Sequence, residues 1–209
     1  NPYLGGYFSN GNLTTPALTK IGYMDAFVLK LDAGTGIIST SSHYWSLRPG
    51  NAQLLASAVD GLGNVYVAGN FDILSFSLGG STLTRLGTGD AFVAKIDSGG
   101  NVLWAQNVGG SGAWTLGQAL AVDGSGNPYL GGIFQSANLT TPALTKIGDA
   151  DAFVLKLDAG TGAVTWAQNF GGSGAYAWGE ALAVDGSSNP YLGAIFQYAH
   201  LPTPALTKI

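Results

Sequence analysis

Most side chains that could take part in catalysis recur at regular intervals along this chain. All but four of its charged residues belong to repeated sets, the exceptions being Arg48, Asp72, Asp149 and Glu180. The repeated sets are Asp25, Asp90 and Asp151; Asp32, Asp97 and Asp158; Asp60, Asp123 and Asp185; Lys30, Lys95 and Lys156; and Lys20, Arg85, Lys146 and Lys208. An active site requires a unique and asymmetric group of side chains, which repeated positions do not supply. The sequence therefore predicts no catalytic residues and indicates that the protein is not an enzyme.

Metal ligands are equally scarce. The chain has no cysteine, and its two histidines, His43 and His200, lie in variable loops without a partner motif. The Asp-Gly-Ser-Gly-Asn turn that begins at Asp123 offers oxygens, but calcium requires roughly six to eight of them and this turn lacks a bidentate acid. Tight turns favour Asp, Gly and Asn for conformational reasons alone. We therefore predict neither a metal site nor a cofactor.

Aromatic residues fall into a regular and an irregular group. The regular group repeats within the predicted strands and, with two leucines, should be buried between units: Phe27, Phe92, Phe153, Trp104, Trp166, Leu120 and Leu182. The irregular group lies in predicted loops: Trp114, Tyr176, Trp178 and Tyr198. Exposed aromatic rings can stack on sugars, so these four are the candidate ligand-binding residues. Packing between neighbouring units is the alternative explanation of the four side chains, and we favour it.

Two glycosylation sequons occupy the same loop of two repeats. They are Asn12-Leu13-Thr14 and Asn138-Leu139-Thr140. Each is followed by a Thr-Pro step, so Thr14 and Thr140 are also candidates for O-linked sugars. The alternative is that Thr and Pro simply suit an extended connection, but in either case we expect the loop to be exposed.

These residues are carried by a repeat of about 62 residues. Segments related to NPYLGGYF begin at Asn1, Asn64, Asn127 and Asn189, and DAFV segments follow in the same phase. A fixed period of this kind marks an array in which one unit cannot bury its apolar face alone. We expect one tandem-repeat domain over residues 1–209, with units at 1–53 (partial), 54–117, 118–179 and 180–209 (partial).

Each full unit predicts four short strands. In residues 118–179 they are ALAVD, NPYLGGIF, AFVLKLD and VTWAQNF, separated by Asp-Gly and Gly-rich turns. The third strand is apolar on both faces, which is typical of a sheet covered on each side by a neighbour. We therefore predict an all-β fold of propeller-like, four-stranded antiparallel blades, forming an incomplete ring because closure takes roughly 4–8 blades. A β-solenoid or a stack of small sheets is the alternative.

Composition excludes some partners. A formal net charge of −4 and a pI of about 4.8 argue against nucleic acid, which requires a basic surface. No run of 18 apolar residues is present, so we predict no transmembrane helix.

The order of ALAVDGSGNPYLGG, DAFVLKLD and TWAQNFGGSG resembles the SBBP repeat, a bacterial β-propeller repeat family, over essentially the whole chain. Proteins with this repeat are mostly large and secreted or surface-associated. The resemblance thus implies a propeller fold, an extracellular or cell-surface location and no catalytic residues. Family members often have an acidic residue soon after GGSG, where this chain has Trp114 and Thr115, or Tyr176 and Ala177, so a polar role of that loop does not carry over.

The sequence therefore favours an extracellular scaffold or adhesive protein that forms a fibre or larger propeller by head-to-tail packing of blades. About three and a quarter units leave apolar faces uncovered, so we expect part of a longer polypeptide or assembly, with copies of itself or flanking repeats as partners. The alternative function is a carbohydrate- or ligand-binding propeller that uses the irregular aromatics, with glycans as partners. In the first unit, residues 37–44 lengthen the connection between the third and fourth strands, and we expect them to bulge at the surface.

Overall fold

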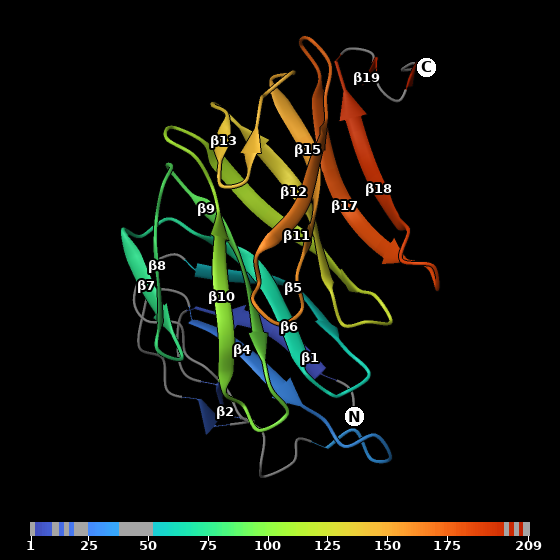
Figure 1. The fold of residues 1–209 in the computed structure, drawn as a ribbon. Coiled ribbons are helices and arrows are strands. Elements are labelled where there is room, and N and C mark those ends of the chain that lie inside the picture. Colours follow the sequence, from blue (N-terminus) through green and yellow to red (C-terminus); the bar gives the residue numbers. More distant parts are fainter. Residues whose placement is uncertain are drawn as a thin grey trace.

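The computed structural model describes residues 3–9, 13–14, 17–18, 25–37, 52–198, 201–202 and 205–206. Every regular element in these ranges is a β-strand, and the strands pair almost entirely antiparallel (Figure 1). The predicted all-β fold is therefore confirmed. The described part of the chain contains no helix that could cross a membrane.

The second unit is a four-stranded antiparallel sheet. Its strands are β5 (Ala52–Val59), β6 (Val65–Phe71), β9 (Asp90–Ile96) and β10 (Val102–Val108), in the spatial order β10-β9-β6-β5. A small hairpin, β7 (Ser75–Leu78) and β8 (Ser81–Thr84), connects the second strand to the third. The four strands predicted for one unit are thus present in sequential order.

The third unit repeats this arrangement. It contains β11 (Trp114–Val122), β12 (Pro128–Gln135), β15 (Ala150–Leu157) and β16 (Val164–Phe170), with the hairpin β13 (Leu139–Thr140) and β14 (Ala143–Leu144) at the same connection. The fourth unit continues with β17 (Tyr176–Val184) and β18 (Pro190–Gln197), followed by the pair β19 (Leu201–Pro202) and β20 (Ala205–Leu206). A single parallel bridge joins β15 to β17, so the two units count as one six-stranded sheet.

The first unit is described in part. Its strands β1 (Tyr3–Phe8) and β4 (Asp25–Lys30) pair antiparallel, and β2 (Leu13–Thr14) pairs with β3 (Ala17–Leu18). Of the segment 37–44 that we expected to bulge, Ile37 is 67% exposed, and the rest lies outside the described residues.

The first strand of each unit is longer than the ALAVD segment that predicted it. A β-bulge interrupts its pairing at the same place three times, between Leu54 and Ala56 in β5 and at the equivalent positions of β11 and β17. A bulge shifts the alternation of inward and outward side chains. The part of the strand before the bulge is therefore out of phase with the period-two pattern of the part after it. Our prediction that Trp114, Tyr176 and Trp178 lie in loops is wrong, since they lie in these strands.

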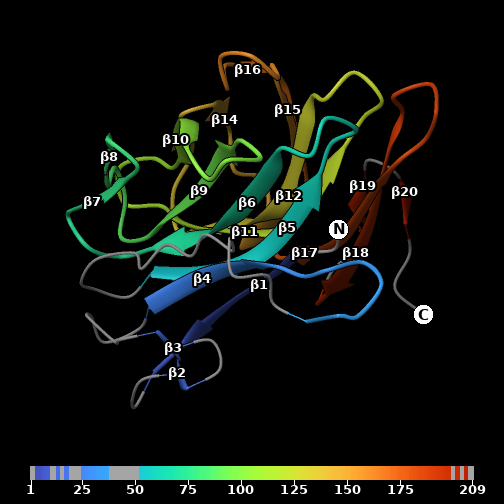
Figure 2. The ribbon, with the colours of Figure 1, turned by 90° about the horizontal axis from the view of Figure 1, so that it is seen from below.

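The core lies between successive sheets, which Figures 1 and 2 show one behind another. One apolar cluster joins Val28 of the first unit to the second unit, a larger one joins the second and third units, and a small one joins the third and fourth. Of the predicted core residues, Phe92 and Phe153 are fully buried and Trp104 is 7% exposed, which confirms them. Three others are half-buried: Phe27, Leu120 and Leu182. The prediction for Trp166 is wrong, since that indole is 40% exposed.

Candidate functional site at the boundaries between repeat units

Two of the repeated aspartates fasten a loop to the sheet. Asp90 and Asp151 are fully buried. Asp151 accepts hydrogen bonds from the backbone amides of Ile147 (2.7 Å) and Gly148 (2.8 Å) and from Nδ2 of Asn169 (2.7 Å). Asp90 accepts the equivalent three bonds in the second unit. The DAFV and WAQN motifs therefore recur together because the carboxylate of one requires the amide of the other.

The aspartates of the tight turns bond to their own backbone. Oδ1 of Asp60 accepts hydrogen bonds from the amides of Leu62 (3.0 Å) and Asn64 (2.9 Å). Equivalent bonds are made by Asp32, Asp97, Asp123, Asp158 and Asp185. Turn formation thus explains these carboxylates, and the described residues contain no group of three His, Asp or Glu that could hold a metal. The two histidines lie outside the described residues.

One of these turns also holds an ion pair. Nζ of Lys156 lies 3.2 Å from Oδ2 of Asp123 and 5.0 Å from the centre of the Tyr129 ring. Burial alone would raise the pKa of Asp123, but hydrogen bonds from Asn127 and Lys156 lower it to about 2. The contact with Tyr129, together with the pairing to Asp123, raises the pKa of Lys156. Both side chains are therefore charged at neutral pH.

Polar bonds cross the boundary between the second and third units and the boundary between the third and fourth units at matching positions. Oη of Tyr66 in the second unit donates to the carbonyl of Gly126 in the third (2.7 Å), and Oη of Tyr129 donates to the carbonyl of Ser188 in the fourth (3.0 Å). In the first case the ring lies over a cationic neighbour, Lys95, whose Nζ is 5.2 Å from its centre. The same tyrosine-to-carbonyl bond is thus made at these two boundaries.

A turn of the third unit caps an indole of the second. Nε1 of Trp104 and Nζ of Lys95 both donate to the carbonyl of Ala159, at 3.2 and 2.9 Å. Gly162 in the same turn has a φ of +72°, and a Cβ there would lie 2.6 Å from the Trp104 ring. Trp166, the equivalent of Trp104 in the third unit, has no such turn over it among the described residues. Its exposure, which we did not expect, follows from that difference.

The face of the fourth unit that points away from the third exposes residues that are buried elsewhere. We call this surface, formed by Tyr191, Ile195 and Trp178, the outer face. Tyr191 is 61% and Ile195 50% exposed, whereas their equivalents in the third unit, Tyr129 and Ile133, are 1% and 0% exposed. Trp178 pairs with Ile195 across β17 and β18 and is half-buried. The outer face is therefore equivalent to a surface that the next unit covers elsewhere, and no unit covers it in the described structure.

Three of the four candidate ligand-binding aromatics come together at one end of this face. The ring centre of Tyr176 lies 5.4 Å from that of Trp178 and 5.8 Å from that of Tyr198. Tyr198, which has a φ of +72°, is the most exposed of them. Trp114, the fourth candidate, is the equivalent of Tyr176 in the preceding unit, is half-buried and lies against Gly89. It is not part of the cluster.

The sequon of the third unit is exposed at its hairpin. Asn138 and Thr140 are both exposed, and Oδ1 of Asn138 accepts a hydrogen bond from the amide of Lys146 (2.8 Å). In the first unit Asn12 lies outside the described residues and the Thr14 side chain is not described.

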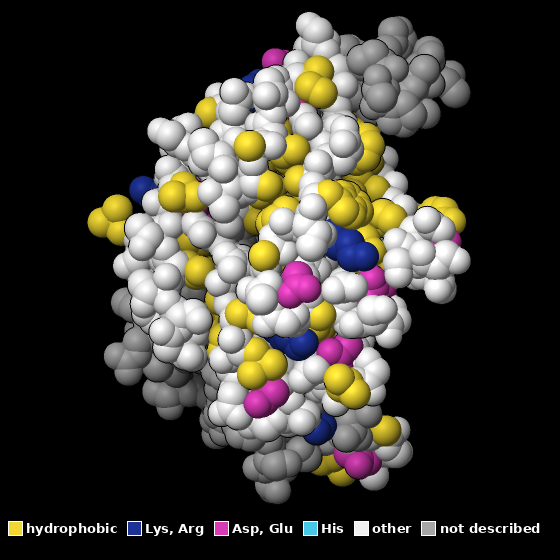
Figure 3. Space-filling view, in the orientation of Figure 1, with side chains coloured by type: hydrophobic (Ala, Val, Ile, Leu, Met, Phe, Trp, Pro, Cys, Tyr) yellow, Lys and Arg dark blue, Asp and Glu magenta, His cyan; other side chains and the backbone are white. Residues whose placement is uncertain are grey.

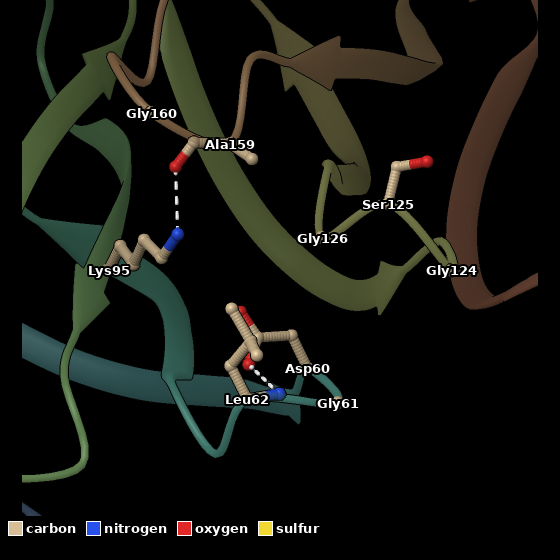
Figure 4. Close-up of a pocket in the computed structure, with 9 residues that line it drawn as sticks. All are labelled: Asp60, Gly61, Leu62, Lys95, Gly124, Ser125, Gly126, Ala159 and Gly160. Atoms are coloured by element: carbon tan, nitrogen blue, oxygen red, sulfur yellow. Dashed lines mark hydrogen bonds between the residues drawn. The ribbon is translucent and has the colours of Figure 1, made fainter.

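A pocket of about 550 Å³ lies between the second and third units (Figure 4). Its wall consists of Lys95 and of residues 60–62, 124–126 and 159–160 of three turns, so glycine main chain forms much of it. Figure 3 shows acidic and basic side chains interspersed on this face of the molecule. One pattern in the sequence could have indicated this pocket, although we did not predict it: the Asp-Gly turns recur in phase with the lysine of the third strand.

No protein-family model matches this chain, and no curated protein is significantly similar to it.

Proposed function

We propose that this chain is a structural module of an extracellular scaffold or adhesive repeat protein, in which a further unit of the same kind packs on the outer face. The observation that carries the proposal is the contrast between equivalent residues, because Tyr191 and Ile195 are exposed where Tyr129 and Ile133 are buried. An exposed apolar face of this kind is typical of an interaction surface. The occupant is a unit with the apolar residues that the fourth unit presents to the third, among them Leu192 and Phe196.

The finer architecture belongs to the same proposal. We propose that the units are propeller-like blades of the SBBP type. Two features support this. The first strands β5, β11 and β17 follow one another through close contacts, and each full unit places its four strands in sequential order from that strand outwards. An extracellular or cell-surface location is supported by the resemblance alone, and antibody labelling of intact source cells tests it.

Self-association of the chain tests the packing proposal. Head-to-tail contacts of this kind give rings or filaments, so the mean mass in sedimentation velocity should rise with protein concentration. Ile195→Lys places a charge on the outer face and should abolish the rise. Leu62→Lys is the matched control, because Leu62 is 85% exposed in a turn away from that face. A wild-type chain that stays monomeric at about 100 μM, a concentration at which even weak association is populated, would overturn the proposal.

Carbohydrate binding is the second candidate function. The convergence of Tyr176, Trp178 and Tyr198 favours it, since adjacent rings of this kind form a platform for a sugar. A glycan array with the wild type should then show binding that Tyr198→Ala removes and Trp114→Ala retains. Equal loss in both variants, or no binding at all, would exclude this cluster as a sugar site.

A further inference from the structure

We propose that the pocket between the second and third units binds a neutral polyhydroxyl ligand of the size of a mono- or disaccharide. This site is separate from the aromatic cluster and does not depend on the proposed function. The four strands of both units that form the pocket are described, so the pocket belongs to a covered boundary.

Four segments from the two units surround the pocket (Figure 4). Lys95 and the turn 60–62 come from the second unit, and the turns 124–126 and 159–160 come from the third. Lys95 reaches across the boundary, since its Nζ donates to the carbonyl of Ala159 at 2.9 Å. The volume of about 550 Å³ lies within the range of small-molecule sites, roughly 300–1,000 Å³. A ligand in this pocket would contact both units.

The carboxylate of Asp60 retains an acceptor position for such a ligand. Its Oδ1 accepts hydrogen bonds from the amides of Leu62 and Asn64, and its Oδ2 accepts one from Nδ2 of Asn64 (2.7 Å). The hydroxyl of Tyr66 lies 3.4 Å from the same Oδ2, but its single proton is donated to the carbonyl of Gly126 at 2.7 Å. One lone pair of Oδ2 is therefore available.

The ammonium group of Lys95 retains a donor. Of its three protons, one is donated to the carbonyl of Ala159, and the ring of Tyr66 lies 5.2 Å from Nζ in a second direction. No ion pair joins Lys95 to Asp60 in the part of the chain that the structure describes. Because a hydroxyl both donates and accepts, neighbouring hydroxyls of one ligand can bond to the carboxylate and to the ammonium. They also reproduce the hydrogen bonds of the water that they displace.

The charges around the pocket favour a neutral ligand. Two carboxylates, those of Asp60 and Asp158, interact electrostatically with Lys95. An anionic ligand would be repelled by these two groups, and a cationic ligand would be repelled by the ammonium. A neutral ligand avoids both repulsions.

The repeat departs from its pattern at the edge of this pocket. The three described Asp-Gly turns read DGLGN, DGSGN and DGSSN, so Leu62 stands where the other two turns have Ser125 and Ser187. The Leu62 side chain is 85% exposed and lines the pocket, where it offers an apolar surface to the carbon atoms of a sugar ring. The pocket therefore has the asymmetry that a binding site requires and that most of the repeated positions lack.

Titration of the full chain with sugars, followed by amide chemical shifts in NMR, tests the proposal. The chain carries Ile195→Lys so that self-association does not interfere, and the probes are glucose, mannose, galactose, maltose and lactose. We expect at least one of them to bind saturably with a Kd below about 10 mM. The shifts should occur in residues 60–62, 124–126 and 159–160, on both sides of the boundary. The uronate and the 2-amino sugar of the same configuration should bind at least about 10-fold more weakly.

Two variants identify the groups that bind. Leu62→Ser restores the residue of the other turns and should weaken binding about 5-fold without changing the melting temperature, because the side chain is exposed. Leu74→Ser is its control, at a leucine that is 78% exposed outside the pocket. Lys95→Met should weaken binding about 10-fold or more, whereas Lys30→Met, at the same strand position of the first unit, should have no effect on binding.

Several results would overturn the proposal. It is wrong if none of the five sugars binds at about 50 mM, or if the uronate or amino sugar binds as tightly as its neutral parent. It is also wrong if Leu62→Ser and Lys95→Met both bind like the parent chain. Binding that Tyr198→Ala removes and Leu62→Ser retains would assign the sugar to the aromatic cluster instead of the pocket.

Discussion

At the scale of single residues, the repeated charges of this chain serve its architecture. Asp90 and Asp151 have no exposed surface, and each is surrounded by three donors from the chain itself. A buried carboxylate is tolerated only when such donors satisfy it. These aspartates recur in the sequence because each unit uses the same hydrogen bonds to hold a loop against its sheet.

Removal of one such carboxylate should be costly. Asp151→Ala leaves the amides of Ile147 and Gly148 and Nδ2 of Asn169 without their acceptor, so we expect the free energy of unfolding to fall by about 3 kcal/mol or more. Denaturant titration followed by circular dichroism measures this. Asp149→Ala, at an exposed position two residues away, is the control and should change stability by less than about 0.5 kcal/mol. Equal effects in the two variants would contradict the fastening role.

At the scale of elements, the connection between units demands glycine. Gly109 and Gly171 open the GG step after the fourth strand, and a Cβ on either would lie within hydrogen-bonding distance or less of the buried carboxylate. On Gly171 the new atom would be 1.9 Å from Oδ1 of Asp151. The first glycine of the GGSG segment is therefore required by its close approach to the aspartate and not by a need for flexibility.

Alanine substitution of Gly171 tests whether this glycine is needed because of its close approach to Asp151. Gly171→Ala should lower the unfolding free energy by about 2 kcal/mol, as overpacking does in a well-packed core. Gly124→Ala is the matched control, because a Cβ at that turn glycine meets nothing within 4 Å. Thermal melts of both variants give the comparison. If the Gly171→Ala protein is as stable as the Gly124→Ala protein, the Asp151 side chain moves to make room for the new Cβ, and close approach does not require glycine there.

The sequence pattern predicted some strands correctly and missed parts of others. Alternating and doubly apolar segments predicted the strands that contain Phe92 and Phe153, because both faces of those strands are covered by the same repeat. The bulge hid the upstream half of β5, β11 and β17, since it reverses the alternation on which the prediction depended. The exposure of Trp166 could not be predicted from its own sequence, because the turn that covers its equivalent belongs to the next unit.

At the scale of the whole molecule, the units are joined by a small number of repeated contacts. The covered boundary between the third and fourth units contains the bond from Tyr129 to the Ser188 carbonyl. The equivalent Tyr191 is exposed, and within the part of the chain that the structure describes its hydroxyl bonds to Asp185 of its own turn. The cluster of Tyr176, Trp178 and Tyr198 could not be predicted from the sequence, because Tyr198 reaches the other two only through the fold.

The two tyrosines form a matched pair for measuring the joint. Tyr129→Phe removes only the hydroxyl that crosses the boundary and should lower stability by about 1 kcal/mol. Tyr191→Phe removes an equivalent hydroxyl that is exposed and should have almost no effect on the dilute chain. Equilibrium unfolding of both variants tests this, and a cost at Tyr191 equal to that at Tyr129 would mean that the boundary bond contributes nothing.

The acceptors of these boundary bonds have a consequence for how such a protein can change over generations. Tyr66 and Tyr129 donate to main-chain carbonyls, of a glycine in one case and a serine in the other. A carbonyl is present whatever side chain the position carries, so the donor does not recognise which unit follows it. These bonds therefore require no compensating mutation at the acceptor position when a unit is duplicated, deleted or exchanged by recombination, and similar repeats are what such a history would leave.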